Sequence, residues 1–226
     1  MTPEEEKFAE IFMPYHYQRQ KKILLEKTRL VHYTNAEAAT SIIKNKEFWL
    51  RESSCMNDYL EVTHGRDCIM DAYNSSPQGE TFKKALNSLH NNITNEIQDL
   101  FNGWLPSLEN DTYLGCFSEH DSDEDTVGRL SMWRAYSETQ GVALVMNNEV
   151  FFNESDFFKG LYTSKVAYTD NEGIKKYLGE IATNITENND FLERRERKLV
   201  VGYVFNLLRF AVLCSKHPGF KEEKEW

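Results

Sequence analysis

The stretch 29–58 constrains the fold of this chain most, because it places a short strand directly before a helix. Residues 29–34 form an apolar run that ends in His32, Tyr33 and Thr34. A strand ending there brings His32 to a helix N-terminus, where unpaired backbone N–H groups and the positive end of the helix dipole favour anions. Two interpretations of His32 stay open here: a core histidine satisfied by its neighbours, and a contact to a ligand.

The helix after this strand is marked by its first residues. Thr34 and Glu37 match a Thr-x-x-Glu capping box, and apolar residues at helical spacing follow over 35–46. A second strand is predicted at 48–50, followed by a polar loop over 53–58. Because side chains alternate along a strand, the tyrosine between His32 and Thr34 is predicted to point away from both and to pack into the core.

Length and charge narrow the functional classes. The 226 residues suffice for one domain with a sizeable core. The formal net charge of -10 argues against broad binding to nucleic acid or to an anionic membrane. Four cysteines without a Cys-x-x-Cys pair, and no signal peptide at the start, predict reduced thiols in a cytoplasmic protein. The longest apolar stretch, 199–214, is too short and too polar for a membrane span.

The remaining periodicities predict an α+β domain, because strands and helices alternate without a regular βαβ rhythm. A helical segment over 1–28 is expected to precede a single domain over 29–226. The predicted helices cover 3–27 with a break at Pro14, 58–73, 82–101, 129–137 and 171–216 with a break at 188–189, and the predicted strands cover 112–118, 142–146, 161–168 and 220–226.

The acidic segment 119–125 has five carboxylates in seven residues. Its alternating aspartates resemble the start of a calcium loop, but Thr126 stands where the turn glycine belongs and Met132 where the closing glutamate belongs. We therefore predict a solvated, mobile loop and no metal site. His64 and Cys68 share a helical face, but two ligands do not make a zinc site.

The end of the sequence carries two carboxylates at strand spacing. On a strand over 220–226, Glu223 and Glu225 would point to the same face. Two carboxylates on one rigid face can divide a reaction between them: one stabilises an oxocarbenium-like transition state while the other orients a nucleophile. The alternative is a charged tail without a function. Because such a strand would be short, we expect the domain to continue beyond Trp226.

Several short motifs, taken in order, resemble a large bacterial family of uncharacterised domains often found near phage-defence genes. Members carry a His-Tyr-Thr near the start, a Phe-Asn-Asp or similar loop, a Cys-Phe-Ser strand, a Met-Trp-x-x-Tyr helix and a Glu-Lys-Glu-Trp-Arg end. The resemblance covers about residues 29 to 226. The matching segments here are His32 to Thr34, Ser54 to Asp58, Gly115 to Ser118, Met132 to Tyr136, Gly141-Val142 and Glu223 to Trp226.

That family in turn resembles the ADP-ribosyltransferase fold, a split antiparallel β-sheet that clasps NAD, with several packed helices. In that fold the first strand offers a His or Arg to the NAD ribose, which His32 matches, and Thr34 matches the next position of the His-x-Thr pattern. A middle strand often carries a serine, for which Ser118 is the candidate. A late strand supplies the catalytic glutamate, often within a Glu-x-Glu, which Glu223 and Glu225 match.

Three features depart from the pattern. Tyr33 lies beside His32 rather than on a separate element. The arginine expected after Trp226 lies beyond the end of the sequence, and the aromatic side chain that would stack on nicotinamide is not singled out. Trp49, Tyr59, Trp133 and Tyr136 are the candidates, and we assign cofactor contacts to Trp133, Tyr136 and the loop residue Asn57.

The resemblance implies an NAD-dependent ADP-ribosyltransferase or NAD glycohydrolase, as a toxin or phage-defence effector that modifies protein or nucleic acid. NAD is then a substrate, with His32 and Thr34 at the ribose or its neighbouring phosphate. Glu225 would bind the nicotinamide ribose 2′-hydroxyl, and Glu223 would steer the acceptor.

Two alternatives stay open. A non-catalytic module of the same fold would bind a nucleotide or a protein; it gains if His32 and Glu225 point apart. An RNA-directed phosphotransferase would need cations along the cleft, for which the candidates are Arg29, Arg51, Arg66 and Arg134.

Overall fold

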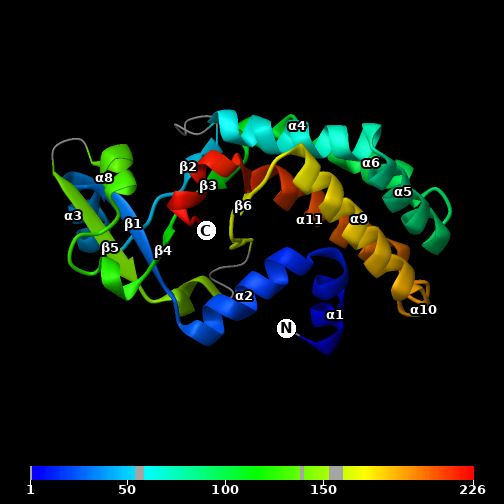
Figure 1. The fold of residues 1–226 in the computed structure, drawn as a ribbon, viewed down its shortest axis with the longest axis horizontal. Coiled ribbons are helices and arrows are strands. Elements are labelled where there is room, and N and C mark those ends of the chain that lie inside the picture. Colours follow the sequence, from blue (N-terminus) through cyan, green and yellow to red (C-terminus); the bar gives the residue numbers. More distant parts are fainter. Residues whose placement is uncertain (1, 54–58, 138–139, 153–159) are drawn as a thin grey trace. The chain divides into compact units, whose positions relative to one another are not determined.

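A computed structural model describes residues 2–53, 59–137, 140–152 and 160–226 (Figure 1). The chain divides into two compact units, each assembled from three stretches. Unit 1 comprises residues 1–18, 52–112 and 167–218, and unit 2 comprises residues 19–51, 113–166 and 219–226. The boundary predicted at residue 28 falls inside one stretch of unit 2.

Unit 1 is mainly helical. Helix α5 packs on α9, α4 packs on both α9 and α11, and α6 packs on α11. A short parallel ladder joins β6 to β7. The elements lying wholly within this unit are α1 (Pro3–Phe12), α4 (Tyr59–Ser75), α5 (Pro77–Leu89), α6 (Ile93–Trp104), α7 (Ser107–Asn110), β6 (Ala167–Tyr168), α9 (Asn171–Glu187), α10 (Asn189–Leu192), α11 (Arg197–Leu213) and β7 (Ser215–Lys216).

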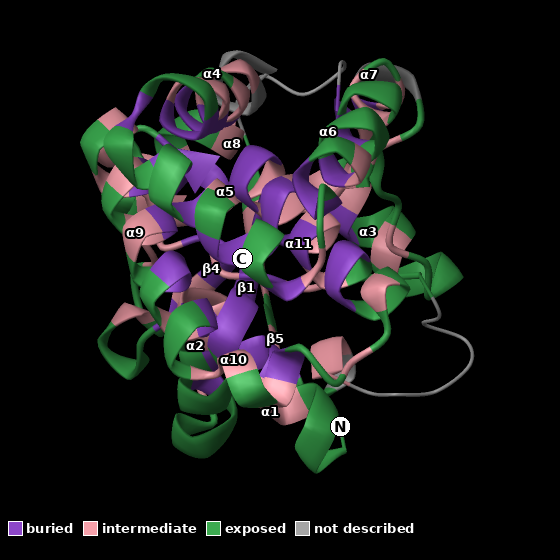
Figure 2. Cartoon of the chain, turned by 90° about the vertical axis from the view of Figure 1, so that its right-hand side faces the viewer, coloured by how far each residue is buried: buried purple, intermediate pink, exposed green. Residues whose placement is uncertain are grey.

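The core of unit 1 follows from helical periodicity. Apolar residues spaced three and four apart give each long helix one buried side, coloured purple in Figure 2. Local caps set the helix starts: Ser76 accepts from the backbone N–H of Gly79 at the start of α5, and Asp170 accepts from that of Gly173 at the start of α9.

Unit 2 is built on a three-stranded sheet of order β4-β1-β5. Both β4 and β5 pair antiparallel with β1. A further two-stranded ladder joins β2 to β3. The elements in or entering this unit are α2 (Pro14–Glu26), β1 (Arg29–Asn35), α3 (Ala36–Asn45), β2 (Arg51–Glu52), β3 (Tyr113–Leu114), β4 (Ser118–His120), η2 (Ser122–Glu124), α8 (Leu130–Tyr136), β5 (Gly141–Met146), η3 (Asn148–Phe152) and η5 (Pro218–Glu223), where η marks a 3-10 helix.

The α+β class, the break at Pro14 and the break near 188–189 are confirmed. The single helix predicted over 82–101 is wrong, because the chain turns between α5 and α6. Asn92 adopts a left-handed φ of 57°, and the Asn87 side chain bonds Thr94 across the turn. Such a turn leaves the apolar spacing nearly intact, so periodicity alone misses it.

Three further boundaries differ. The cap of α3 is Asn35, whose side chain accepts from the N–H of Ala38, rather than Thr34. The strand predicted over 112–118 is split into β3 and β4, and most of the strand predicted over 161–168 is irregular. The ladder between β6 and β7 is parallel, whereas the predicted sheet is antiparallel. Among the described helices, none is long and apolar enough to cross a membrane.

Gly65 tests the tight packing of unit 1. A Cβ at this position of α4 would lie 2.3 Å from the backbone oxygen of Val212 in α11. We expect Gly65→Ala to lower the free energy of unfolding by about 2 kcal/mol, because backbone must move to make room. Gly202→Ala is the control: its Cβ meets nothing within 4 Å, so better helix propensity should raise stability by about 0.5–1 kcal/mol. Urea denaturation followed by circular dichroism measures both; equal effects would contradict the packing.

Candidate functional site

The C-terminal residues join the sheet of unit 2 beside β4. Ser118 lies opposite Val31 of β1 on one side and opposite Glu225 on the other. The bridge to Glu225 is flanked by two backbone hydrogen bonds, from Trp226 N–H to Phe117 O at 2.7 Å and from Glu119 N–H to Lys224 O at 2.9 Å. We call residues 218–226 the tail. Its last three residues, 224–226, therefore extend the sheet to the order tail-β4-β1-β5.

This register decides which side chains share a face. Residues directly opposite each other in an antiparallel pair point to the same side, and neighbours along a strand point to opposite sides. We call the side with Val31, Tyr33, Ser118 and Glu225 the serine face. The other side, with Leu30, His32, Phe117 and Trp226, is the histidine face.

His32 and Glu225 therefore point to opposite faces of one sheet. The structure does not bring together the pair around which the sequence-based site was built. It does bring together Ser118 and Glu225, as direct cross-strand neighbours. The serine face also receives Trp133 and Tyr136, because α8 packs there in one apolar cluster with Val31, Tyr33, Met132 and Ala143.

The polar groups on the serine face are deeply buried. Ser118 and Glu225 are each 1% exposed. The Ser118 hydroxyl has no hydrogen-bond partner among the described residues. Leaving a buried hydroxyl without a partner costs about 1–3 kcal/mol, and such groups are rare in folded proteins. The Ser118 hydroxyl beside the buried Glu225 carboxylate therefore marks the serine face as the candidate site.

Gly141 lets α8 approach this face closely. A Cβ on Gly141 would lie 2.1 Å from the Ser137 hydroxyl and 2.9 Å from the Trp133 ring. The Trp133 indole is fixed by a 2.7 Å hydrogen bond from Nε1 to the Val127 carbonyl and by an edge contact with the Tyr33 ring. A glycine at this position is thus required by the packing of the tryptophan.

On the histidine face, His32 is a packed residue. Its Nδ1 lies 3.1 Å from the Cys116 carbonyl, to which the ring N–H donates. Its ring meets those of Phe48 and Phe117 at 4.8 and 5.5 Å between centroids. Burial lowers the pKa of His32 below its ordinary value. Thr34 is half-buried and lies on the same side of β1.

The tail does not have the predicted strand geometry. Residues Pro218–Glu223 form a 3-10 helix, and Lys224 adopts a left-handed φ of 48°. The i and i+2 rule for strands thus does not place Glu223 beside Glu225. Sequence reasoning missed this turn because a lysine gives no signal for positive φ.

Arg129 is a structural residue of this site that sequence reasoning missed. Its Nη1 donates to the Glu223 carbonyl at 2.9 Å and its Nη2 to the Glu119 carbonyl at 2.8 Å. Its Nε donates to the Glu124 carboxylate at 2.9 Å, and its backbone N–H donates to the Tyr33 hydroxyl at 2.9 Å. One guanidinium thus joins α8, β4, the acidic segment and the tail.

The acidic segment 119–125 is largely exposed over residues 121–125, as predicted for a solvated loop, but it is also held by ion pairs. Besides the contact to Arg129, three further ion pairs hold it: Arg29 with Asp125, Lys224 with Asp121 and Lys165 with Glu119. Within the segment, the His120 ring hydrogen-bonds Asp125 at 2.8 Å. The hydrogen bonds from His120 and Arg29 lower the pKa of Asp125, and the hydrogen bond from Lys224 lowers that of Asp121. The segment thus anchors the tail beside β4.

Asn57, the remaining predicted cofactor residue, lies outside the described residues. Within the described ranges, no group of three or more His, Cys, Asp or Glu side chains is arranged to hold a metal ion. His64 Nε2 contacts the Thr169 carbonyl at 2.9 Å and lies within 4 Å of the Cys68 sulfur.

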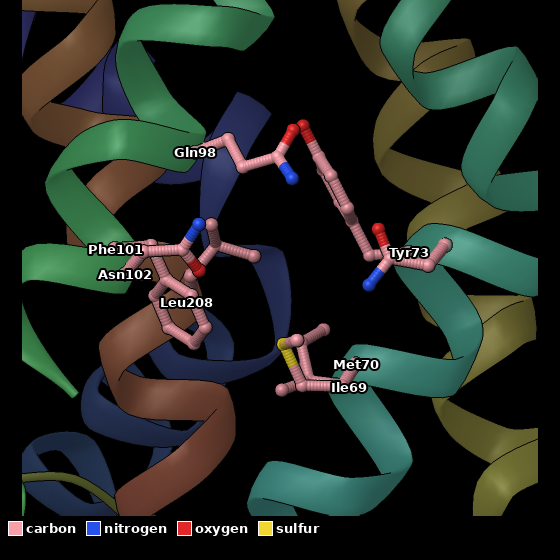
Figure 3. A pocket seen from close by; sticks show the side chains of 8 residues that line it. Ile69, Met70, Tyr73, Gln98, Phe101, Asn102 and Leu208 are labelled. Atoms are coloured by element: carbon pink, nitrogen blue, oxygen red, sulfur yellow. The ribbon is translucent and has the colours of Figure 1, made fainter.

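A small cavity lies in unit 1 (Figure 3). Its volume of about 20 Å³ has room for a water-sized molecule but not for a nucleotide. None of the predicted site residues lines it. The lining side chains are apolar or neutral and come from α4, α6 and α11: Ile69, Met70, Tyr73, Asn74, Gln98, Phe101, Asn102 and Leu208.

The Arg129 contacts predict a strong effect of its removal. We expect Arg129→Ala to lower the free energy of unfolding by about 2–3 kcal/mol, because several partly buried acceptors lose charged hydrogen bonds at once. Arg129→Lys should recover little, since one ammonium cannot replace the guanidinium fork. Arg134, exposed on the same helix, is the control and should change stability by less than about 0.5 kcal/mol when replaced by Ala. Chemical denaturation measures all three; equal losses at Arg129 and Arg134 would contradict the anchoring role.

Residues 132–226 match a family model described as "Protein of unknown function (DUF2971)". The matched region begins within α8 and includes β5, Glu223 and Glu225, but neither His32 nor Ser118. No curated protein and no solved structure matches the chain. The match agrees with the expectation of an uncharacterised domain in this part of the sequence.

Proposed function

We propose that this protein is an NAD-cleaving, ADP-ribosyltransferase-like enzyme whose reaction face is the serine face of the unit 2 sheet. The observation that carries the proposal is the cross-strand pair formed by Ser118, on the strand next to β1, and Glu225, on the segment that pairs with the other side of that strand. The resemblance stated above assigns a first strand, a serine strand and a glutamate strand to NAD binding. Here these three segments are hydrogen-bonded neighbours in that order.

Glu225 has the central role in the proposed reaction. Its carboxylate would accept a hydrogen bond from the nicotinamide ribose 2′-hydroxyl and stabilise positive charge at C1′ as the glycosidic bond breaks. Nicotinamide leaves with the bonding electrons, and water or an acceptor nucleophile forms the new bond to C1′. Ser118 would bind the ribose or the nicotinamide amide, and Glu223 would steer the acceptor.

The structure changes the proposed cofactor contacts. Tyr33, Trp133 and Tyr136 lie on the serine face and are the aromatic candidates for nicotinamide. His32 and Thr34 lie on the other face, so we propose that His32 supports the sheet through Phe48 and Phe117 rather than binding the ribose. Because Glu225 is 1% exposed, NAD binding requires the side chains covering this face to move.

The second candidate is a non-catalytic module that binds a nucleotide or a protein. The opposite-facing side chains of His32 and Glu225 favour it, because the paired site expected of the enzyme is not assembled in this form. The RNA-directed phosphotransferase has less support: of its candidate cations, Arg29 pairs with Asp125 and Arg66 with Asp67.

The enzyme proposal predicts that Glu225→Gln abolishes NAD cleavage. We expect nicotinamide release from labelled NAD to fall by about 10²-fold or more, because the amide cannot supply the negative charge that stabilises the transition state. Glu222→Gln is the matched control on the exposed side of the same tail and should retain the native rate.

The same assay separates the candidates. Adding cell lysate shows whether label moves to protein, to nucleic acid or only to water. Native-rate cleavage by the Glu225→Gln protein would end the proposed mechanism. Saturable NAD binding by calorimetry without nicotinamide release would favour the binding module.

A further inference from the structure

Strand β5 is an edge strand of the unit 2 sheet. Within the described part of the chain it pairs with β1 alone, in the order β4-β1-β5. Its six residues, Gly141–Met146, contain no charged residue and no proline. Natural proteins usually protect such edges with charges, prolines or bulges, because an open edge pairs with other strands. The outer edge of β5 therefore needs an explanation.

The register shows which backbone groups point outward. Ala36 N–H donates to Gln140 O at 3.0 Å, one step beyond the β1–β5 ladder. Because hydrogen-bonded and non-hydrogen-bonded pairs alternate in an antiparallel ladder, the even-numbered residues of β5 bond to β1. The N–H and C=O groups of Gly141, Ala143 and Val145 then point away from β1, along the open edge.

The side chains near this edge are small or apolar. Val145 is 41% exposed although it lies within a strand. Gly141 carries no side chain, and the Trp133 ring and the Ser137 hydroxyl lie directly over it. The Val145 side chain points to the serine face, because Val145 lies opposite Val31. Gly141 lies on the same face, since it is four residues away on the same strand.

We propose that β5 is a dimerisation edge, which pairs antiparallel with β5 of a second copy of this chain. With Ala143 opposite Ala143 of the second copy, Val145 lies opposite Gly141 of that copy. The exposed valine then packs against the partner's Trp133 ring, which lies over Gly141. The outward N–H and C=O groups of all three residues gain partners, and the two sheets become continuous.

The pattern of the strand argues for a second copy rather than an unrelated peptide. A two-fold axis at Ala143 makes the strand complementary to itself, with the small residue at one end facing the exposed apolar residue at the other. Two-fold interfaces require such self-complementarity. No like charges on β5 oppose each other across the axis.

Sedimentation velocity over a concentration series tests the proposal. We expect the native chain to shift from monomer to dimer, and Val145→Lys to raise the dissociation constant by at least about tenfold, because each copy places a lysine against the partner strand. Leu130→Lys is the control, since Leu130 is an exposed apolar residue of α8 outside the strand. It should leave the dimer unchanged.

Val145→Thr separates an effect of charge from an effect on the strand, since threonine keeps the β-branched shape and should largely retain the dimer. Far-UV circular dichroism verifies that each variant is folded. A native chain that stays monomeric up to its solubility limit would overturn the proposal. A dimer that survives Val145→Lys would also overturn it, because its interface must then lie elsewhere.

Discussion

The backbone pairing of β4 with two partners, β1 on one side and the C-terminal residues on the other, organises unit 2. Ser118 is the residue where both ladders meet. Its two partners, Val31 and Glu225, each lie more than 80 residues from Ser118 in the sequence. Bringing such distant segments together costs chain entropy, which other contacts must offset. The Arg129 guanidinium supplies such contacts by binding the carbonyls of Glu119 and Glu223, which lie on the two paired segments.

The acidic segment gains its role from the same arrangement. Its sequence predicts a solvated loop, because five carboxylates in a short span repel one another and contact water readily. In the structure, Lys165 and the Trp226 indole both bind the Glu119 carboxylate. The charged side chains of this segment thus hold the tail beside β4. Burial lowers the pKa of Lys165, while its contact with Glu119 opposes that shift.

The sequence predicted most of the helices and the central strands, because both have strong periodicity. It missed the turn at Asn92 and the left-handed Lys224, since neither residue changes the apolar pattern around it. The face on which each strand residue lies was harder to predict. A register shift of one residue exchanges the two faces of a strand, and that register depends on pairing with distant segments. The burial of Tyr33 was predicted correctly: it is 3% exposed. The expectation that His32 and Glu225 share a site had no local sequence signal to support it.

Cross-linking tests whether Glu225 pairs with Ser118 on the face opposite His32. Cα atoms of directly opposed, non-hydrogen-bonded residues lie about 4.5 Å apart, within the range that a disulfide spans. The Ser118→Cys, Glu225→Cys protein should therefore form a disulfide between these two positions under mild oxidation, identified by peptide mass mapping. The His32→Cys, Glu225→Cys protein should not form one. A disulfide between positions 32 and 225, with none between 118 and 225, would contradict this account.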